Sequence, residues 1–113
     1  VTAELMNDTA LCMLPERGGL TEDEARAMIE SLTLAPILKG WRGRPKADVA
    51  ALAQAICAFS GMADQLRDRL AEAEINPLFV LPEGEGVRAA DGVVILKTDA
   101  RFSRSGSLPS AMR

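Results

Sequence analysis

Two oxygen-bearing side chains, Glu74 and Asn76, stand two positions apart and could bind a metal ion. Side chains alternate faces along a β-strand, so a strand at this point places both on one face. A carboxylate and an amide oxygen are hard ligands suited to Mg²⁺, which keeps several waters and is completed by phosphate oxygens. The pair therefore indicates a candidate magnesium site.

A second carboxylate, Asp91, joins this group if the chain turns back on itself. Residues 70–81 are typical of an extended segment, and residues 87–96 form a second one rich in Val and Ile. The Pro and Gly content of residues 82–86 between them is typical of a hairpin loop. We therefore expect two antiparallel strands.

The register of this hairpin decides whether Asp91 reaches the other two side chains. If the loop is residues 82–85, Leu81 pairs with Gly86, and counting back places Asn76 opposite Asp91. Directly opposed residues have Cβ atoms roughly 4.5–5.5 Å apart. One bulged residue would instead move Asp91 to the other face. An alternative without chemistry is also open, because Asn-Pro and Asp-Gly pairs often mark only strand ends and turns.

Two helices are predicted to support this hairpin. The first begins at Thr21, where Glu24 three residues later completes a capping box. Apolar residues then recur at helical spacing, at Ala25, Met28, Ile29 and Leu32.

The second helix is predicted to begin near Asp48, whose carboxylate complements the helix dipole. The Ser60-Gly61 pair is expected to interrupt it, with a short polar helix over residues 63–70. The apolar stripe of the helix that begins near Asp48 comprises Val49, Leu52, Ala53, Ile56 and Phe59.

Residues 1–5 alternate weakly, residues 9–14 are largely apolar, and the turn-like Asn7-Asp8 pair lies between them, so a second hairpin is expected. Two helices and two hairpins indicate an α+β fold with helices packed on an antiparallel sheet. Residues 36–45 are expected to form a loop with two glycines and three basic side chains, Lys39, Arg42 and Arg44. Such a loop could receive a phosphate or carboxylate, or be an ordinary solvated connection.

Composition excludes several classes of function. The chain of 113 residues is long enough for one domain, and its net charge of −3 does not favour nucleic-acid or anionic-membrane partners. The absence of His excludes catalytic triads that use it and the usual zinc sites. Cys12 and Cys57 favour inert thiols in a cytoplasmic protein, although a disulfide remains an alternative.

Two motifs resemble one family. EINPL at residues 74–78, followed by ADG at 90–92, resembles the end of the ATP-grasp domain of ADP-forming acyl-CoA synthetases, such as succinyl-CoA synthetase β subunits and acetate–CoA ligases. LKGWRGRP at 38–45, followed by Asp48, resembles a second segment of that family. The resemblance implies that residues 1–96 are part of the C-terminal ATP-grasp subdomain. Residues 97–113 are expected to be a flexible tail.

The resemblance also implies ligands for particular residues. Asn76 and Asp91 match the family positions that hold the Mg²⁺ of the nucleotide. Arg42 is carried over as a nucleotide-site residue, with its ligand left open. Glu74 is added because it shares a face with Asn76 and could bind the metal or orient its waters. The implied cofactors are Mg²⁺ and ATP, with CoA bound elsewhere. The implied partners are a small carboxylic acid, the other ATP-grasp subdomain and CoA-binding domains, in cis or as a subunit.

The implied reaction converts an acid, CoA and ATP into acyl-CoA, ADP and phosphate, and the isolated chain is not expected to perform it. Two alternatives stay open at this point. One is a regulatory ATP-grasp region of a protein acetyltransferase. The other is an interaction module that kept the fold without catalysis, which an exposed apolar docking patch would indicate.

Overall fold

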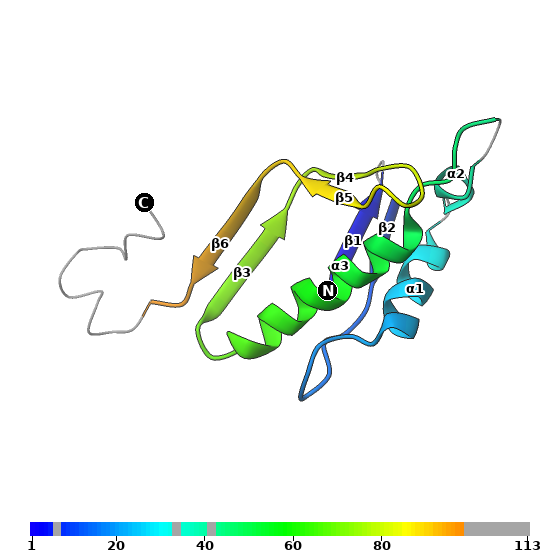
Figure 1. The fold of residues 1–113 in the computed structure, drawn as a ribbon. Helices are drawn as coiled ribbons and strands as arrows, with labels where there is room; N and C mark the ends of the chain where they lie inside the picture. The colour runs from blue at the N-terminus through cyan, green and yellow to red at the C-terminus, as the bar shows by residue number, and fades with distance from the viewer. Residues whose placement is uncertain (6–7, 33–34, 41–42, 99–113) are drawn as a thin grey trace.

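The computed structural model describes residues 1–5, 8–32, 35–40 and 43–98 (Figure 1). Within these ranges the chain is α+β, as the sequence predicts. Helices pack against antiparallel hairpins. The elements in chain order are β1 (Thr2–Leu5), β2 (Asp8–Leu11), α1 (Glu22–Ser31), α2 (Ala35–Leu38), α3 (Val49–Gln65), β3 (Leu70–Ile75), β4 (Leu78–Val80), β5 (Val87–Ala89) and β6 (Gly92–Leu96).

In the described ranges, strand pairing is divided among three two-stranded ladders, β1–β2, β3–β6 and β4–β5. The last two are successive parts of one long hairpin, because β3 continues into β4 and β5 returns into β6 (Figure 1). Pro77 lies between β3 and β4, where a residue without an N–H can sit outside the ladder. The N-terminal hairpin is confirmed, with Thr2 opposite Leu11 and Leu5 opposite Asp8.

Helix α1 begins as predicted. The Thr21 hydroxyl accepts a hydrogen bond from the Glu24 N–H at 3.2 Å, and the Glu24 carboxylate accepts one from the Thr21 N–H at 3.0 Å. This capping box satisfies two backbone donors at the start of the helix. The predicted apolar stripe is buried, and it is made of Ala25, Met28, Ile29 and Leu32.

The core lies where α1, α3 and the N-terminal hairpin meet. Neither β3 nor β6 contributes to it, and both strands are drawn to one side of α3 in Figure 1. The hairpin that carries the candidate site is therefore held mainly by its own strand pairing along β3 and β6. The buried core residues are Ala10, Leu20, Ala25, Met28, Ile29, Leu32, Ala35, Ala53 and Ile56.

The expected interruption of the second helix is wrong. Helix α3 continues through Ser60 and Gly61 to Gln65, so no separate helix covers residues 63–70. The Ser60 hydroxyl donates to the carbonyl of Cys57 at 2.8 Å and accepts from the backbone N–H of Leu20 at 2.7 Å. This buried side chain thus completes a contact between α3 and the segment before α1, and the contact outweighs the weak helix propensity of Ser and Gly.

The expected loop over residues 36–45 is also partly wrong, because α2 occupies its beginning. This short helix lies next to α1, with which it is in contact, and Ala35 at its start is buried in the core. Burial explains why the segment departs from a plain loop. None of the helices in the described residues is long and apolar enough to cross a membrane.

Candidate functional site

The hairpin has the register that the sequence predicts. At its closed end the Leu81 N–H donates to the carbonyl of Gly86 at 3.0 Å. At the far end of the same hairpin the Asn76 N–H donates to the carbonyl of Asp91 at 3.1 Å. The ladder of β4 and β5 keeps this register between the two ends, with Leu78 opposite Ala89. Asn76 and Asp91 therefore lie opposite each other.

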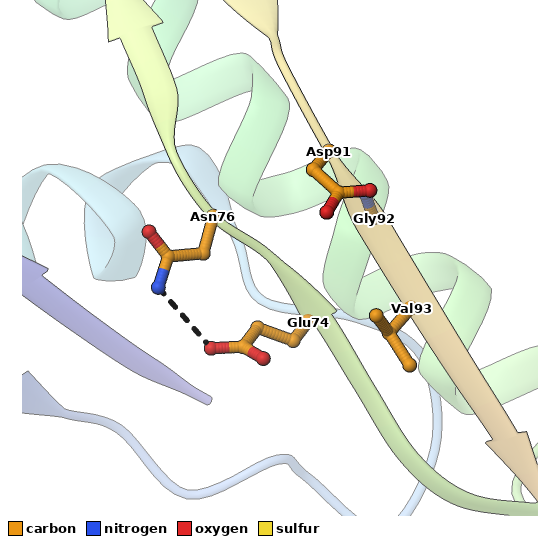
Figure 2. Close-up of a pocket in the computed structure, with 5 residues that line it drawn as sticks. All are labelled: Glu74, Asn76, Asp91, Gly92 and Val93. Atoms are coloured by element: carbon orange, nitrogen blue, oxygen red, sulfur yellow. Dashed lines mark hydrogen bonds between the residues drawn. The ribbon is translucent and has the colours of Figure 1, made fainter.

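Glu74, Asn76 and Asp91 line one shallow depression together with Gly92 and Val93 (Figure 2). Glu74 and Asn76 come from the end of β3 and the residue after it, and Asp91 directly precedes β6. The Asn76 side-chain N–H donates to a carboxylate oxygen of Glu74 at 3.4 Å, and one carboxylate oxygen of Asp91 accepts from the Gly92 N–H at 2.8 Å. All three side chains are exposed to solvent.

The donor set in this depression is two carboxylates and one amide oxygen. Among the described residues, no three His, Cys, Asp or Glu side chains gather in an arrangement that would hold a metal ion. The protein thus offers part of a coordination shell of hard oxygens. Such a set fits Mg²⁺, which retains waters and takes up substrate phosphate oxygens, better than a metal that requires a closed protein cage.

The basic loop over residues 36–45 shows less of an anion-binding site than its composition indicates. Arg42 lies outside the described residues, so its role in binding a nucleotide stays a prediction. Lys39 forms an ion pair with Glu30 at 2.6 Å. Arg44 is exposed. The described part of this loop therefore shows no gathering of cations around one point.

Asp48 has a role that sequence reasoning missed. One of its carboxylate oxygens accepts a hydrogen bond from the Ala51 N–H at 3.1 Å and so caps α3. The other accepts from the N–H groups of Gly84 at 3.1 Å and Gly86 at 2.9 Å. Both glycines have positive φ, near 88° and 86°, which aims their N–H groups at this carboxylate in a way that other residues rarely allow.

These contacts lower the pKa of Asp48 below its ordinary value of 3.8. The hydrogen bond from Ala51 is the main cause, those from Gly86 and Gly84 add to it, and burial acts in the opposite direction. A carboxylate that accepts several backbone N–H bonds is stabilised in its charged form. The ionised side chain is therefore the one that joins α3 to the hairpin loop.

Acid is expected to remove the contribution of Asp48 to stability. Because the folded-state pKa is depressed, this contribution is complete above about pH 3.8 and is lost as the pH falls through the folded value. We expect the Tm difference between wild-type protein and Asp48→Asn to be largest near neutral pH and to shrink below about pH 3.8. Calorimetry of both proteins from about pH 7 to about pH 3 measures this difference. A difference that stays constant over the range would contradict the assignment.

Comparison with known proteins identifies the family. Residues 1–96 match the family model of the ATP-grasp domain. The chain belongs to the ATP-grasp domain family. This confirms the resemblance predicted from the motifs at residues 74–78 and 38–45.

The curated relatives that match the chain include ADP-forming acetate–CoA ligases. Over 97 residues the chain is 35% identical to the β subunit of an acetate–CoA ligase (ADP-forming) II of Pyrococcus furiosus, covering 86% of this chain and 39% of the relative. It is 30% identical over 95 residues to an acetate–CoA ligase (ADP-forming) of Methanocaldococcus jannaschii, covering 84% of this chain and 13% of the relative. The chain thus spans well under half of the curated relatives that it matches.

Solved structures agree with the ATP-grasp assignment. A protein of Pyrococcus horikoshii aligns with a TM-score of 0.75 and 33% identity, over 83% of this chain and 37% of that one. An acetyl-coenzyme A synthetase of Ca. Korarchaeum cryptofilum aligns with a TM-score of 0.68 and 27% identity, over 80% of this chain and 39% of that one. The latter structure holds coenzyme A and Mg-AMPPCP.

Proposed function

We propose that this chain is part of an ADP-forming acid–CoA ligase and supplies part of its Mg²⁺–nucleotide site. The overall reaction is acid, CoA and ATP giving acyl-CoA, ADP and phosphate. The observation that carries the proposal is that Glu74, Asn76 and Asp91 line one depression on the hairpin, in a chain of the ATP-grasp family. The curated relatives named as ADP-forming ligases support this reaction.

Asn76 and Asp91 are the residues proposed to hold the metal ion. The Asn76 amide nitrogen is engaged by Glu74, which leaves the amide oxygen as the group available to a cation. Glu74 is proposed to orient this amide and metal-bound water. When bound, Mg²⁺ offsets the charge of the nucleotide phosphates. We assign Arg42 to the nucleotide site as well, with its ligand unspecified.

The remaining groups that the reaction needs are proposed to lie outside this chain. Residues 1–96 would form part of the C-terminal ATP-grasp subdomain, and residues 97–113 would form a tail. Residues 99–113 lie outside the described part of the chain. The other ATP-grasp subdomain and the CoA and acid sites would be supplied in cis or by another subunit. A cytoplasmic location agrees with Cys12 and Cys57, which are free thiols.

The regulatory and non-catalytic alternatives are not favoured. The curated relatives include ADP-forming ligases of acetate and of 4-hydroxybutyrate. The hairpin exposes apolar side chains on both of its faces, because Val93 and Val94 are consecutive in β6 and therefore point to opposite sides. Consecutive side chains on opposite faces are not the single docking patch that an interaction module would indicate.

The proposal is tested with the full-length protein, Mg²⁺, ATP, CoA and a panel of small carboxylic acids. We expect ADP and acyl-CoA to form in equal amounts with at least one acid, and formation to stop when EDTA removes the metal. Incubation without CoA is the control for simple ATP hydrolysis. A protein that folds normally and turns over none of the acids would contradict the proposed reaction.

A further inference from the structure

The loop at the closed end of the hairpin is attached to the rest of the protein by two different sets of contacts. The first set is made by the backbone. Ala47 bridges to Pro82, the Asp48 N–H donates to the carbonyl of Leu81 at 2.7 Å, and the Glu83 N–H donates to the carbonyl of Lys46 at 2.8 Å. These bonds all reach residues 81–83, so they hold the outgoing strand and the first part of the loop.

The second set is made by the Asp48 carboxylate. Its Oδ2 accepts from Gly84 and Gly86, which lie where the chain turns back into β5. Asp48 itself is 9% exposed, and its two hydrogen bonds to the loop are partly buried. It therefore holds the returning half of the loop, which the backbone contacts of residues 46–48 do not reach.

The residue at which the chain turns back into β5 decides which side chains lie opposite each other at the candidate site. Side chains alternate faces, so a slip of one residue would move Asp91 to the face opposite Asn76. The hairpin has the register of the Leu81–Gly86 pair all the way to Asn76 and Asp91, roughly 17 Å along the strands. The buried core contains no residue of β3, β4, β5 or β6, although α3 contacts β4 and β5. The core cluster itself therefore does not set this register.

We propose that Asp48 is a positioning residue for the metal site, which it serves by holding Gly84 and Gly86 in the register that places Asn76 opposite Asp91. The metal part of this inference rests on the proposed function. Asp48 touches neither the metal nor the nucleotide in this scheme. It acts through the hairpin, and its capping of α3 is a separate role of the other carboxylate oxygen.

The two roles are separated by Asp48→Ser in the full-length protein. A serine hydroxyl can still cap the helix, but it lacks the second oxygen that reaches the loop. We expect the Mg²⁺ concentration for half-maximal activity to rise about tenfold, the lower end of the effect of removing partners of metal ligands. The KM for CoA is expected to stay unchanged. An unchanged Mg²⁺ midpoint in Asp48→Ser would overturn the proposal.

Thr21→Ala is the matched control. Thr21 caps α1 through the same kind of bond to Glu24, and its hydrogen bonds in the described structure do not reach the hairpin loop. This variant is expected to lower the Tm and leave the Mg²⁺ midpoint unchanged. If both variants raise the midpoint equally, general loss of stability explains the effect and the positioning role is wrong.

A measurement without metal tests the register separately. Amide hydrogen exchange in EDTA is expected to be at least several-fold faster at Asn76, Leu81 and Ala90 in Asp48→Ser, and unchanged in α1. These amides bond across the hairpin, to Asp91, Gly86 and Pro77. Faster exchange with an unchanged Mg²⁺ midpoint would show that Asp48 holds the register of the hairpin but does not position the metal site. Unchanged exchange rates would show that Asp48 does not hold the register of the hairpin.

Discussion

Asp91→Ala in the full-length protein is expected to lower kcat/KM for acyl-CoA formation by roughly 10²–10³-fold. The proposed metal ligand is lost, and a metal ion supplies several kcal/mol of charge stabilisation to phosphoryl transfer. Asn76→Ala is expected to have an effect in the same direction, since the two side chains line the same depression. Steady-state kinetics over a range of Mg²⁺ concentrations measure both.

Glu72→Ala is the control for this prediction. Glu72 is an exposed acid of β3 on the same face as Glu74, one alternation further along, and it does not line the depression. Its removal changes the charge of the protein by the same amount as Asp91→Ala and is expected to leave the kinetics unchanged. Equal activity and equal Mg²⁺ dependence in wild type, Asn76→Ala and Asp91→Ala would reject the metal assignment.

Gly19→Ala is expected to destabilise the protein by about 2–4 kcal/mol, through overpacking and loss of a buried hydrogen bond. A Cβ at Gly19 would lie 2.6 Å from the backbone nitrogen of Gly61 and 2.7 Å from the hydroxyl of Ser60. Backbone atoms of a helix cannot give way cheaply. The segment must move, and the 2.7 Å bond from the Leu20 N–H to Ser60 breaks with it. Denaturant unfolding measures the loss.

Gly61→Ala tests the other side of the same contact. A Cβ at Gly61 meets no atom within 4 Å, and alanine is favoured over glycine inside a helix. This variant is expected to be up to about 1 kcal/mol more stable than wild type. The sign of the change therefore differs between two glycines that touch each other. A loss of stability in Gly61→Ala, or none in Gly19→Ala, would show that the packing of this contact is wrong.

The sequence predicts the hairpin and its register because loop composition and strand alternation already indicate both, although the contact of Asp48 with Gly84 and Gly86 is not visible in the sequence. The Pro- and Gly-containing loop limits where the chain can turn, and alternation along the strands then places Asn76 opposite Asp91. The start of α1 is predictable for the same reason, since Thr21 and Glu24 are close in sequence. Short-range patterns of this kind are visible without a structure.

The features that the sequence does not predict depend on contacts between distant residues. Ser60 and Gly61 have the composition of a helix break, but a bond to Leu20, 40 positions earlier, keeps them in α3. The carboxylate of Asp48 reaches Gly86 across 38 positions, so only its nearby capping role is visible in the sequence. In both cases tertiary contacts override or extend local propensity.

The separation of the buried core from the hairpin with the candidate site has a consequence for how this chain can evolve. Most substitutions destabilise proteins, and selection removes those that fall below a stability threshold. Glu74, Asn76 and Asp91 are exposed and lie outside the core cluster, so substitutions at these positions are expected to change the stability of the fold little. Lineages can therefore alter or abandon the chemistry of this depression while the fold persists.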